Sequence, residues 1–105
     1  MDVIAQRSLV LRAAGRDTPV IVRLGKPQPD KRYDSWACLY EVRVGDHVES
    51  QEIHGADSLQ AVQLSLASLD GFLKHVLKKH DGDLLHEDEP FISLLEASGL
   101  VEASK

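Results

Sequence analysis

The feature that most constrains the fold is the apolar pattern of residues 54–80, HGADSLQAVQLSLASLDGFLKHVLKKH. Its large apolar residues are separated by alternating steps of three and four, at Leu59, Val62, Leu66, Leu69, Leu73 and Val76. Because an α-helix has about 3.6 residues per turn, this spacing places all six on one side of a helix. Such a helix needs an apolar surface to cover, and the segments before it indicate a β-sheet.

The ends of this helix carry the residues that helix ends favour. Asp57 is a good N-cap, and Gln60 three residues later resembles the second half of a capping box. Basic residues occupy the last turn, and Gly82 suits the position after the end. Gly71 lies in mid-helix, where it favours either a close crossing over the sheet or a kink. Since the apolar spacing continues through Gly71, the sequence predicts one helix over residues 57–80.

Four segments before the helix have the alternating or β-branched pattern of strands, residues 3–13, 19–24, 35–44 and 47–54. The third is the clearest, and the face expected to meet the helix carries Trp36, Cys38, Tyr40, Val42 and Val44. Residues 14–19 read as a turn. Residues 25–34 (GKPQPDKRYD) contain two prolines and five charges, which predicts a long loop rather than a strand.

The last two strands meet at Gly45–Asp46, which suits a type II′ hairpin turn. A strict two-residue turn places Glu49 and Gln51 opposite apolar residues. Val48 and Ile53 are five positions apart, so they cannot both point inward from a regular strand. The sequence therefore predicts a β-bulge in residues 47–54 and places this strand at a sheet edge.

The segment after the helix divides in two. Residues 81–89 carry five acidic side chains and read as a solvated loop. Residues 90–97 (PFISLLEA) predict a short helix with Pro90 in its first turn. The residues expected to dock this helix on the core are Phe91, Leu94 and Leu95.

These elements predict a single α+β domain over residues 1–105. A four-stranded antiparallel meander (3–54) is followed by one long helix packed on one face (57–80), and then by an acidic loop and a tail helix (81–105). Val10, Ile21 and Leu39 should point to the uncovered face of the sheet. An open face or edge makes a homodimer one of the partners to consider.

Charge and composition exclude several classes of function. The net charge of −5 provides no basic excess for phosphates, so we expect no nucleic-acid partner. No apolar run approaches the ~20 residues of a membrane span, so we expect no membrane partner and a cytoplasmic protein. The one cysteine cannot form an internal disulfide. Residues 46–105 contain four Lys and twelve acids, 4 − 12 = −8, which would suit a basic protein partner.

No residue set indicates a reaction. Cys38 lies in mid-strand between two aromatic residues, which favours a buried and inert thiol. None of the five histidines, His47, His54, His75, His80 and His86, has the spacing of a zinc motif. Glu41, Glu49 and Glu52 read as surface strand positions, and the acids around His86 read as a solvated loop. We therefore expect no catalytic residues, no metal and no cofactor.

Two groups of side chains are candidate binding residues. The first combines basic and aromatic residues at the end of the predicted loop: Lys31, Arg32, Tyr33 and Trp36. The second is acidic and follows the helix: Asp83, Glu87, Asp88 and Glu89. For the first group the alternative is that Trp36 belongs to the core and Tyr33 closes the loop.

Two segments, WACLYEVRVG (36–45) and GADSLQA (55–61), support a resemblance to a known family. Together they resemble a family of short, uncharacterised bacterial domains with a Trp-x-Cys-x-aromatic strand and a Gly-x-Asp-Ser-x-Gln-Ala helix start. The similarity covers roughly residues 1–80. It implies a bacterial origin and a β-then-α order, and it implies no activity.

Two functional classes remain open. The first is a non-enzymatic binding or interaction module that contacts another protein. The second is a small-molecule-binding protein or minor enzyme with a pocket between sheet and helix, which would need converging polar groups. Since no catalytic set is visible, the sequence favours the module.

Overall fold

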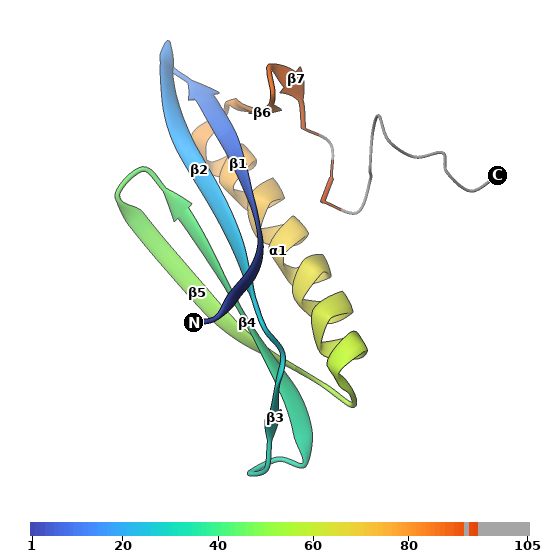
Figure 1. The fold of residues 1–105 in the computed structure, drawn as a ribbon. Helices are drawn as coiled ribbons and strands as arrows, with labels where there is room; N and C mark the ends of the chain where they lie inside the picture. The colour runs from blue at the N-terminus through green and yellow to red at the C-terminus, as the bar shows by residue number, and fades with distance from the viewer. Residues whose placement is uncertain (92, 95–105) are drawn as a thin grey trace, which may run out of the picture.

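The computed structural model describes residues 1–91, 93 and 94. This part of the chain has one long helix, α1 (Ser58–His80), lying across one face of an antiparallel sheet (Figure 1). Within it the sheet contains seven strands: β1 (Val3–Ala13), β2 (Arg16–Gly25), β3 (Gln28–Asp30), β4 (Ser35–Val44), β5 (His47–Gly55), β6 (Asp83–His86) and β7 (Glu89–Pro90). The α+β class and the long helix are confirmed, whereas the number of strands exceeds the predicted four.

The four long strands form the predicted meander. β1 pairs with β2, β2 with β4, and β4 with β5, each antiparallel. β6 pairs with the other side of β1, and β7 extends this edge by pairing with β6. The order across the sheet is therefore β5–β4–β2–β1–β6–β7, with β3 beside the start of β4.

The prediction of a loop over residues 25–34 is wrong for β3. Gln28–Asp30 pairs with residues 35–37 of β4 and continues the line of β2. Among the described strands, β3 pairs only with β4. A strand that pairs on one side tolerates Pro29, because the missing N–H can face the open edge.

The acidic segment 81–89 is also not a plain solvated loop. Leu84 is 2% exposed and pairs with Leu11 in the β6–β1 ladder, so one leucine fixes a strand within a run of acids. The turn predicted over residues 14–19 is shorter than expected. β2 already begins at Arg16, which leaves Ala14 and Gly15, both with positive φ, as a two-residue turn.

β5 is an edge strand, as predicted, but it contains no bulge. Its register with β4 is regular, and Glu49 and Gln51 lie opposite Val42 and Tyr40. Both polar residues are exposed to solvent, as are all the residues from His47 to Glu52, so this part of β5 does not require apolar side chains. Val48 points to the open face and is 41% exposed. In the turn before it only Gly45 has positive φ, as a type II′ turn requires.

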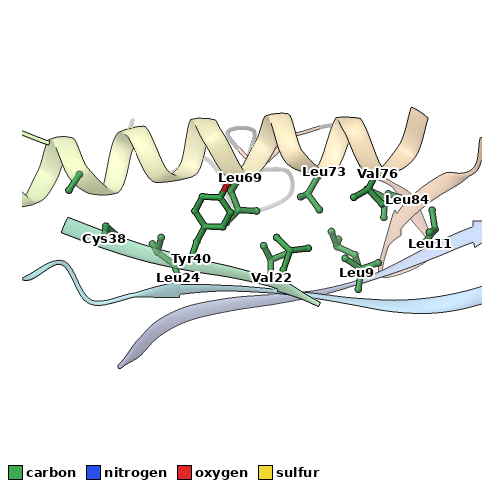
Figure 2. Packing of buried hydrophobic residues seen from close by; sticks show 13 residues of the cluster. Leu9, Leu11, Val22, Leu24, Cys38, Tyr40, Leu69, Leu73, Val76 and Leu84 are labelled. Atoms are coloured by element: carbon green, nitrogen blue, oxygen red, sulfur yellow. The ribbon is translucent and has the colours of Figure 1, made fainter. Parts of the chain in front are cut away.

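The core lies between α1 and the sheet. Figure 2 shows Leu69, Leu73 and Val76 pointing from the helix toward side chains of β1, β2 and β4. The buried apolar residues of the described chain are Leu9, Leu11, Val20, Val22, Leu24, Cys38, Tyr40, Val42, Ala61, Leu69, Leu73, Val76 and Leu84. Burying each larger aliphatic side chain contributes about 1.5–3 kcal/mol relative to leaving it in water.

The apolar stripe of α1 is correct over most of its length and wrong at its beginning. Leu59 is 67% exposed, and the buried positions of the first two turns are Ala61 and Ser65. Small residues are needed there because the helix approaches the sheet closely. A methyl group added at Gly55 would lie 2.5 Å from the Ala61 nitrogen.

The helix ends follow the predicted caps with one change. Asp57 accepts the Gln60 N–H at 2.8 Å, and Gln60 in return accepts the Ala56 N–H at 2.6 Å. At the other end the left-handed residue is Asp81, not Gly82. Gly82 serves a different purpose, because an added Cβ would lie 2.5 Å from the Arg12 carbonyl oxygen of β1.

The predicted tail helix over residues 90–97 is not present in the described residues 90, 91, 93 and 94. Pro90 belongs to β7, and backbone hydrogen bonding replaces a helical turn, since the Phe91 N–H donates to the Leu84 carbonyl at 2.8 Å. Phe91 and Leu94 pack against the core as expected, while Leu95 lies outside the described residues.

Candidate functional site

The β3–β4 turn, residues 31–34, is built around the Asp30 side chain. Asp30 pairs with Ser35 across the two strands, and its Oδ1 accepts the Arg32 backbone N–H at 3.1 Å. This hydrogen bond is the Asx turn that an aspartate at the first position favours. Asp34 has φ 50°, which lets the chain enter β4. The Asp30 side chain therefore orders the turn, and it also contacts His54 of β5.

The Arg32 guanidinium is held in place from two directions. Its Nε and Nη2 donate to Asp30 Oδ1 and Oδ2 at 3.1 and 3.0 Å, a bidentate pair. The guanidinium carbon also lies 5.2 Å from the centre of the Tyr33 ring. Tyr33 is 66% exposed, and its ring meets the His54 ring edge-on, with centroids 5.5 Å apart. Arg32 and His54 thus support an exposed aromatic side chain.

The end of β5 adds two further groups. His54 Nε2 lies 3.1 Å from Asp30 Oδ2 and 3.5 Å from Glu52 Oε1. The strand register explains why they meet. Their cross-strand partners on β4 are Ala37 and Leu39, which face away from α1. We call Asp30, Arg32, Tyr33, Glu52 and His54 the β3–β5 cluster.

The cluster favours the ionised form of Asp30. The hydrogen bonds from Arg32, and secondarily that from His54, lower the pKa of Asp30 from 3.8 to about 2, against an opposing effect of burial. The Asp30 side chain is only 9% exposed, whereas the Arg32 side chain is 70% exposed. The same pairing raises the pKa of Arg32. The carboxylate is the fixed centre of the cluster, and the arginine reaches it from the solvent side.

A pocket of about 160 Å³ adjoins the cluster on the side of the turn, lined by Pro29, Asp30, Lys31, Asp34, Ser35, Trp36 and Ala56. Ser35, the cross-strand partner of Asp30, has a buried Oγ with no hydrogen-bond partner among the described residues. A buried hydroxyl without a partner is uncommon, and it indicates a place that a water or a polar ligand can satisfy.

The structure brings together three of the four predicted basic-aromatic residues. Lys31, Arg32 and Tyr33 lie in the exposed turn. Trp36 lies on the helix-facing side of β4 and packs half-buried against the core, although it lines the same pocket as Lys31. This is the alternative that the sequence left open for Trp36, whereas Tyr33 remains mostly exposed.

The predicted acidic residues do not join this group. Asp83 begins β6, Glu87 and Asp88 form the β6–β7 turn, and Glu89 begins β7. This hairpin lies at the opposite end of the sheet from β3 (Figure 1). Asp83 lies opposite Arg12 of β1 in the strand register. The two predicted groups therefore do not make one continuous surface.

Sequence reasoning missed Asp30, Glu52 and His54 as members of a site. Glu52 and His54 are two apart on one strand, so they share a face, and this spacing was the available signal. Asp30 could not be added, because residues 25–34 read as a loop. The three side chains place ligand atoms within 4.8 Å of one another, and they are the candidate metal-binding residues of the described chain.

Cys38 and the space between sheet and helix were also considered from the sequence, and neither forms a site with the cluster. Cys38 is fully buried, and its Sγ donates to the Gly25 carbonyl at 3.3 Å. A cleft of about 140 Å³ lies between sheet and helix, lined by Ala5, Gln6, Arg7, Val22, Arg23, Leu24, Leu66, Leu69 and Leu94. This volume is below the roughly 300–1,000 Å³ of ordinary ligand pockets.

Comparison with known proteins identifies the family. Residues 5–93 match the family model described as Domain of unknown function (DUF6968). The chain belongs to the DUF6968 family. No curated protein and no solved structure gives a significant match.

The DUF6968 match covers more than the expected similarity over residues 1–80. It includes β6 and β7 and ends next to Leu94. All five residues of the β3–β5 cluster also lie within it. Within the described residues, α1 does not combine the length and the apolar character that a membrane crossing requires.

Proposed function

We propose that this chain is a non-enzymatic protein-binding module whose contact surface is centred on Tyr33 and Arg32 in the β3–β4 turn. The observation that carries the proposal is that the Tyr33 side chain is exposed to solvent and yet contacted by its neighbours. The residue is 66% exposed, yet its ring contacts both the Arg32 guanidinium and the His54 ring.

Such an arrangement favours binding for an energetic reason. Ordering a free side chain at an interface costs about 0.5–1.5 kcal/mol, and a side chain that is already held avoids much of this cost. Tyrosine and arginine are also the residue types that most often dominate the affinity of protein interfaces. Asp30 fixes Arg32 in turn, so the two contact residues are ordered before a partner arrives.

The charges of the turn indicate the chemistry of the partner. The charge of Arg32 is engaged by Asp30, whereas Lys31 is exposed and has no ion pair among the described residues. We therefore expect a protein that offers an apolar pocket for the Tyr33 ring and a carboxylate near Lys31. The acidic residues at the far hairpin stay a separate prediction.

The alternative, a small-molecule-binding protein or minor enzyme, has less support. The cleft between sheet and helix has a volume of about 140 Å³ and a largely aliphatic lining. Three polar residues, Gln6, Arg7 and Arg23, line it, but its volume is below that of ordinary ligand pockets.

The test begins with capture of a partner from the native host by the immobilised chain, followed by calorimetry with the purified partner. Tyr33→Ala and Arg32→Ala are compared with Leu59→Ala, which removes a side chain of almost equal exposure, 67% against 66%. We expect Tyr33→Ala to weaken binding about tenfold or more, which is roughly 1.4 kcal/mol. Leu59→Ala should leave affinity unchanged.

Equal affinity of Tyr33→Ala and the unaltered chain would contradict the proposal. A turnover abolished by a single substitution would favour the enzyme alternative. Light scattering should accompany these measurements, because among the described strands β5 pairs only with β4. A dimer that Tyr33→Ala dissociates would identify a second copy of the chain as the partner instead of a different protein.

A further inference from the structure

We infer that Asp30, Glu52 and His54 form a binding site for a divalent transition-metal ion, with Zn²⁺ as the best-matched ion. The site would use His54 Nε2, Asp30 Oδ2 and a Glu52 carboxylate oxygen as ligands. The site shares His54 and the Asp30–Arg32 pair with the proposed contact surface, but its test requires no protein partner.

The ligand spacing supports the inference first. Metal–ligand distances of about 2.0–2.2 Å place neighbouring ligands of a tetrahedral zinc site roughly 3.3–3.6 Å apart. His54 Nε2 lies 3.1 Å from Asp30 Oδ2 and 3.5 Å from Glu52 Oε1. The three ligand atoms lie within 4.8 Å of one another, so only small side-chain rotations are needed.

The type of ligand selects the ion. One imidazole nitrogen and two carboxylate oxygens form a mixed N/O set that suits zinc and its neighbours, whereas Mg²⁺ and Ca²⁺ prefer oxygen ligands alone. The charges of Arg32, Asp30 and Glu52 sum to 1 − 2 = −1, which favours a cation. Three protein ligands leave at least one coordination position for water.

The surroundings of Asp30 supply a second, independent observation. Oδ1 accepts two donors from Arg32, the backbone N–H and Nε, which orients the carboxylate and leaves Oδ2 toward His54. Ser35, directly across the strand pair from Asp30, has a buried Oγ without a partner among the described residues. A water or polar ligand beside Asp30 would satisfy this hydroxyl.

Arg32 is the competing cation in this arrangement. Its Nη2 lies 3.0 Å from Oδ2, the oxygen that the metal would use. Because the Arg32 side chain is 70% exposed, it can move away from this oxygen and keep its charge in water. The backbone N–H keeps Asp30 oriented in its absence. Arg32→Ala should therefore strengthen metal binding several-fold.

β5 provides a matched control. His47 Nε2 lies 2.9 Å from Glu49 Oε2, which is also a histidine–carboxylate pair two residues apart on the same strand. Among the described residues no third ligand from another strand joins this pair, and the His47 side chain is 70% exposed. Any binding caused by exposed histidines alone would respond equally to His47→Gln and His54→Gln.

The experiment is a calorimetric titration of the chelator-treated full chain with ZnCl₂, followed by amide NMR to locate the bound ion. We expect one ion per chain, amide shifts confined to residues 28–36 and 50–56, and weak binding of MgCl₂. His54→Gln and Glu52→Gln should each weaken Zn²⁺ binding about tenfold or more, while His47→Gln binds as the unaltered chain.

Several results would overturn the inference. These are no Zn²⁺ binding by the unaltered chain, unchanged binding by His54→Gln, equal losses in His47→Gln and His54→Gln, or no binding by Arg32→Ala. Circular dichroism of each variant identifies unfolding. If His54→Gln does not fold, Glu52→Gln provides the test, because the Glu52 side chain is 47% exposed.

Discussion

Asp70, in the middle of α1, accepts the backbone N–H of Leu94 through its Oδ1 at 2.8 Å. Asp70 is only 5% exposed, and its Oδ2 lies 3.3 Å from Lys74 Nζ. A buried carboxylate thus connects the helix to the chain that follows β7. Since Leu94 and Phe91 pack against the core, this hydrogen bond helps to close the fold at the side of β1.

We expect Asp70→Ala to lower the free energy of unfolding by about 1–3 kcal/mol, because it leaves the Leu94 N–H without its partner. Asp70→Asn should cost less, since the amide oxygen can still accept this hydrogen bond. Urea denaturation measures both changes, and hydrogen exchange reports on the Leu94 amide. Equal stability of Asp70→Ala and the unaltered chain would show that the contact contributes nothing.

Gly71→Ala should stabilise the protein by about 1 kcal/mol. Alanine has a higher helix propensity than glycine, and the helix runs from Ser58 to His80 through this position. A Cβ at Gly71 would meet no atom within 4 Å, so the close crossing considered from the sequence is not there. Thermal unfolding provides the measurement. A lower melting temperature would mean that glycine has a role in the native state.

Two serines of α1 should respond oppositely to alanine. Ser68 Oγ and Tyr40 Oη are 2.8 Å apart, so Ser68→Ala should cost about 0.5–1.5 kcal/mol. Ser65 is fully buried, and its Oγ has no hydrogen-bond partner among the described residues. Ser65→Ala should therefore be neutral or stabilising. Chemical denaturation of both variants tests the contrast, and a larger loss for Ser65→Ala would refute it.

The stability of the protein should depend on Asp30 at acid pH. Its pKa is about 2 in the folded chain, below the ordinary 3.8. A depressed folded pKa gives a stabilisation that is present above about pH 4 and disappears as the pH falls toward 2. In chelator-treated protein, Asp30→Asn should lose this part of the pH dependence. A carboxyl NMR titration of Asp30 with a midpoint near 4 would contradict the pairing with Arg32.

The outcome for the strands shows what sequence patterns can and cannot predict. The long strands were predictable because their segments carry alternating or β-branched apolar residues, most clearly from Trp36 to Val44. β3 and β6 were missed because each contains few residues and takes its stability from a neighbour. Leu84 fixes β6 only through its place opposite Leu11, a relation between positions 73 residues apart. No local composition within residues 81–89 encodes that pairing.

The candidate site divides in the same way. Lys31, Arg32 and Tyr33 were predictable as exposed residues of a polar turn. The meeting of Arg32 and Tyr33 with Glu52 and His54 depends on the register between β4 and β5, and on β3 bringing Asp30 to the same face. A single position of slip would send both β5 side chains to the helix side.

The sequence by itself determined the periodic elements of this protein: the long helix, the meander of long strands, the caps at Asp57 and the hairpin at Gly45. Their causes are local, because helix and strand periods and turn dihedrals are set within a few residues. Only the tertiary structure decided which small residues of α1 are buried, where β6 pairs, and which charged side chains meet. Those outcomes depend on contacts between segments that are distant in the sequence. Such contacts contribute to stability only when the fold brings the segments together.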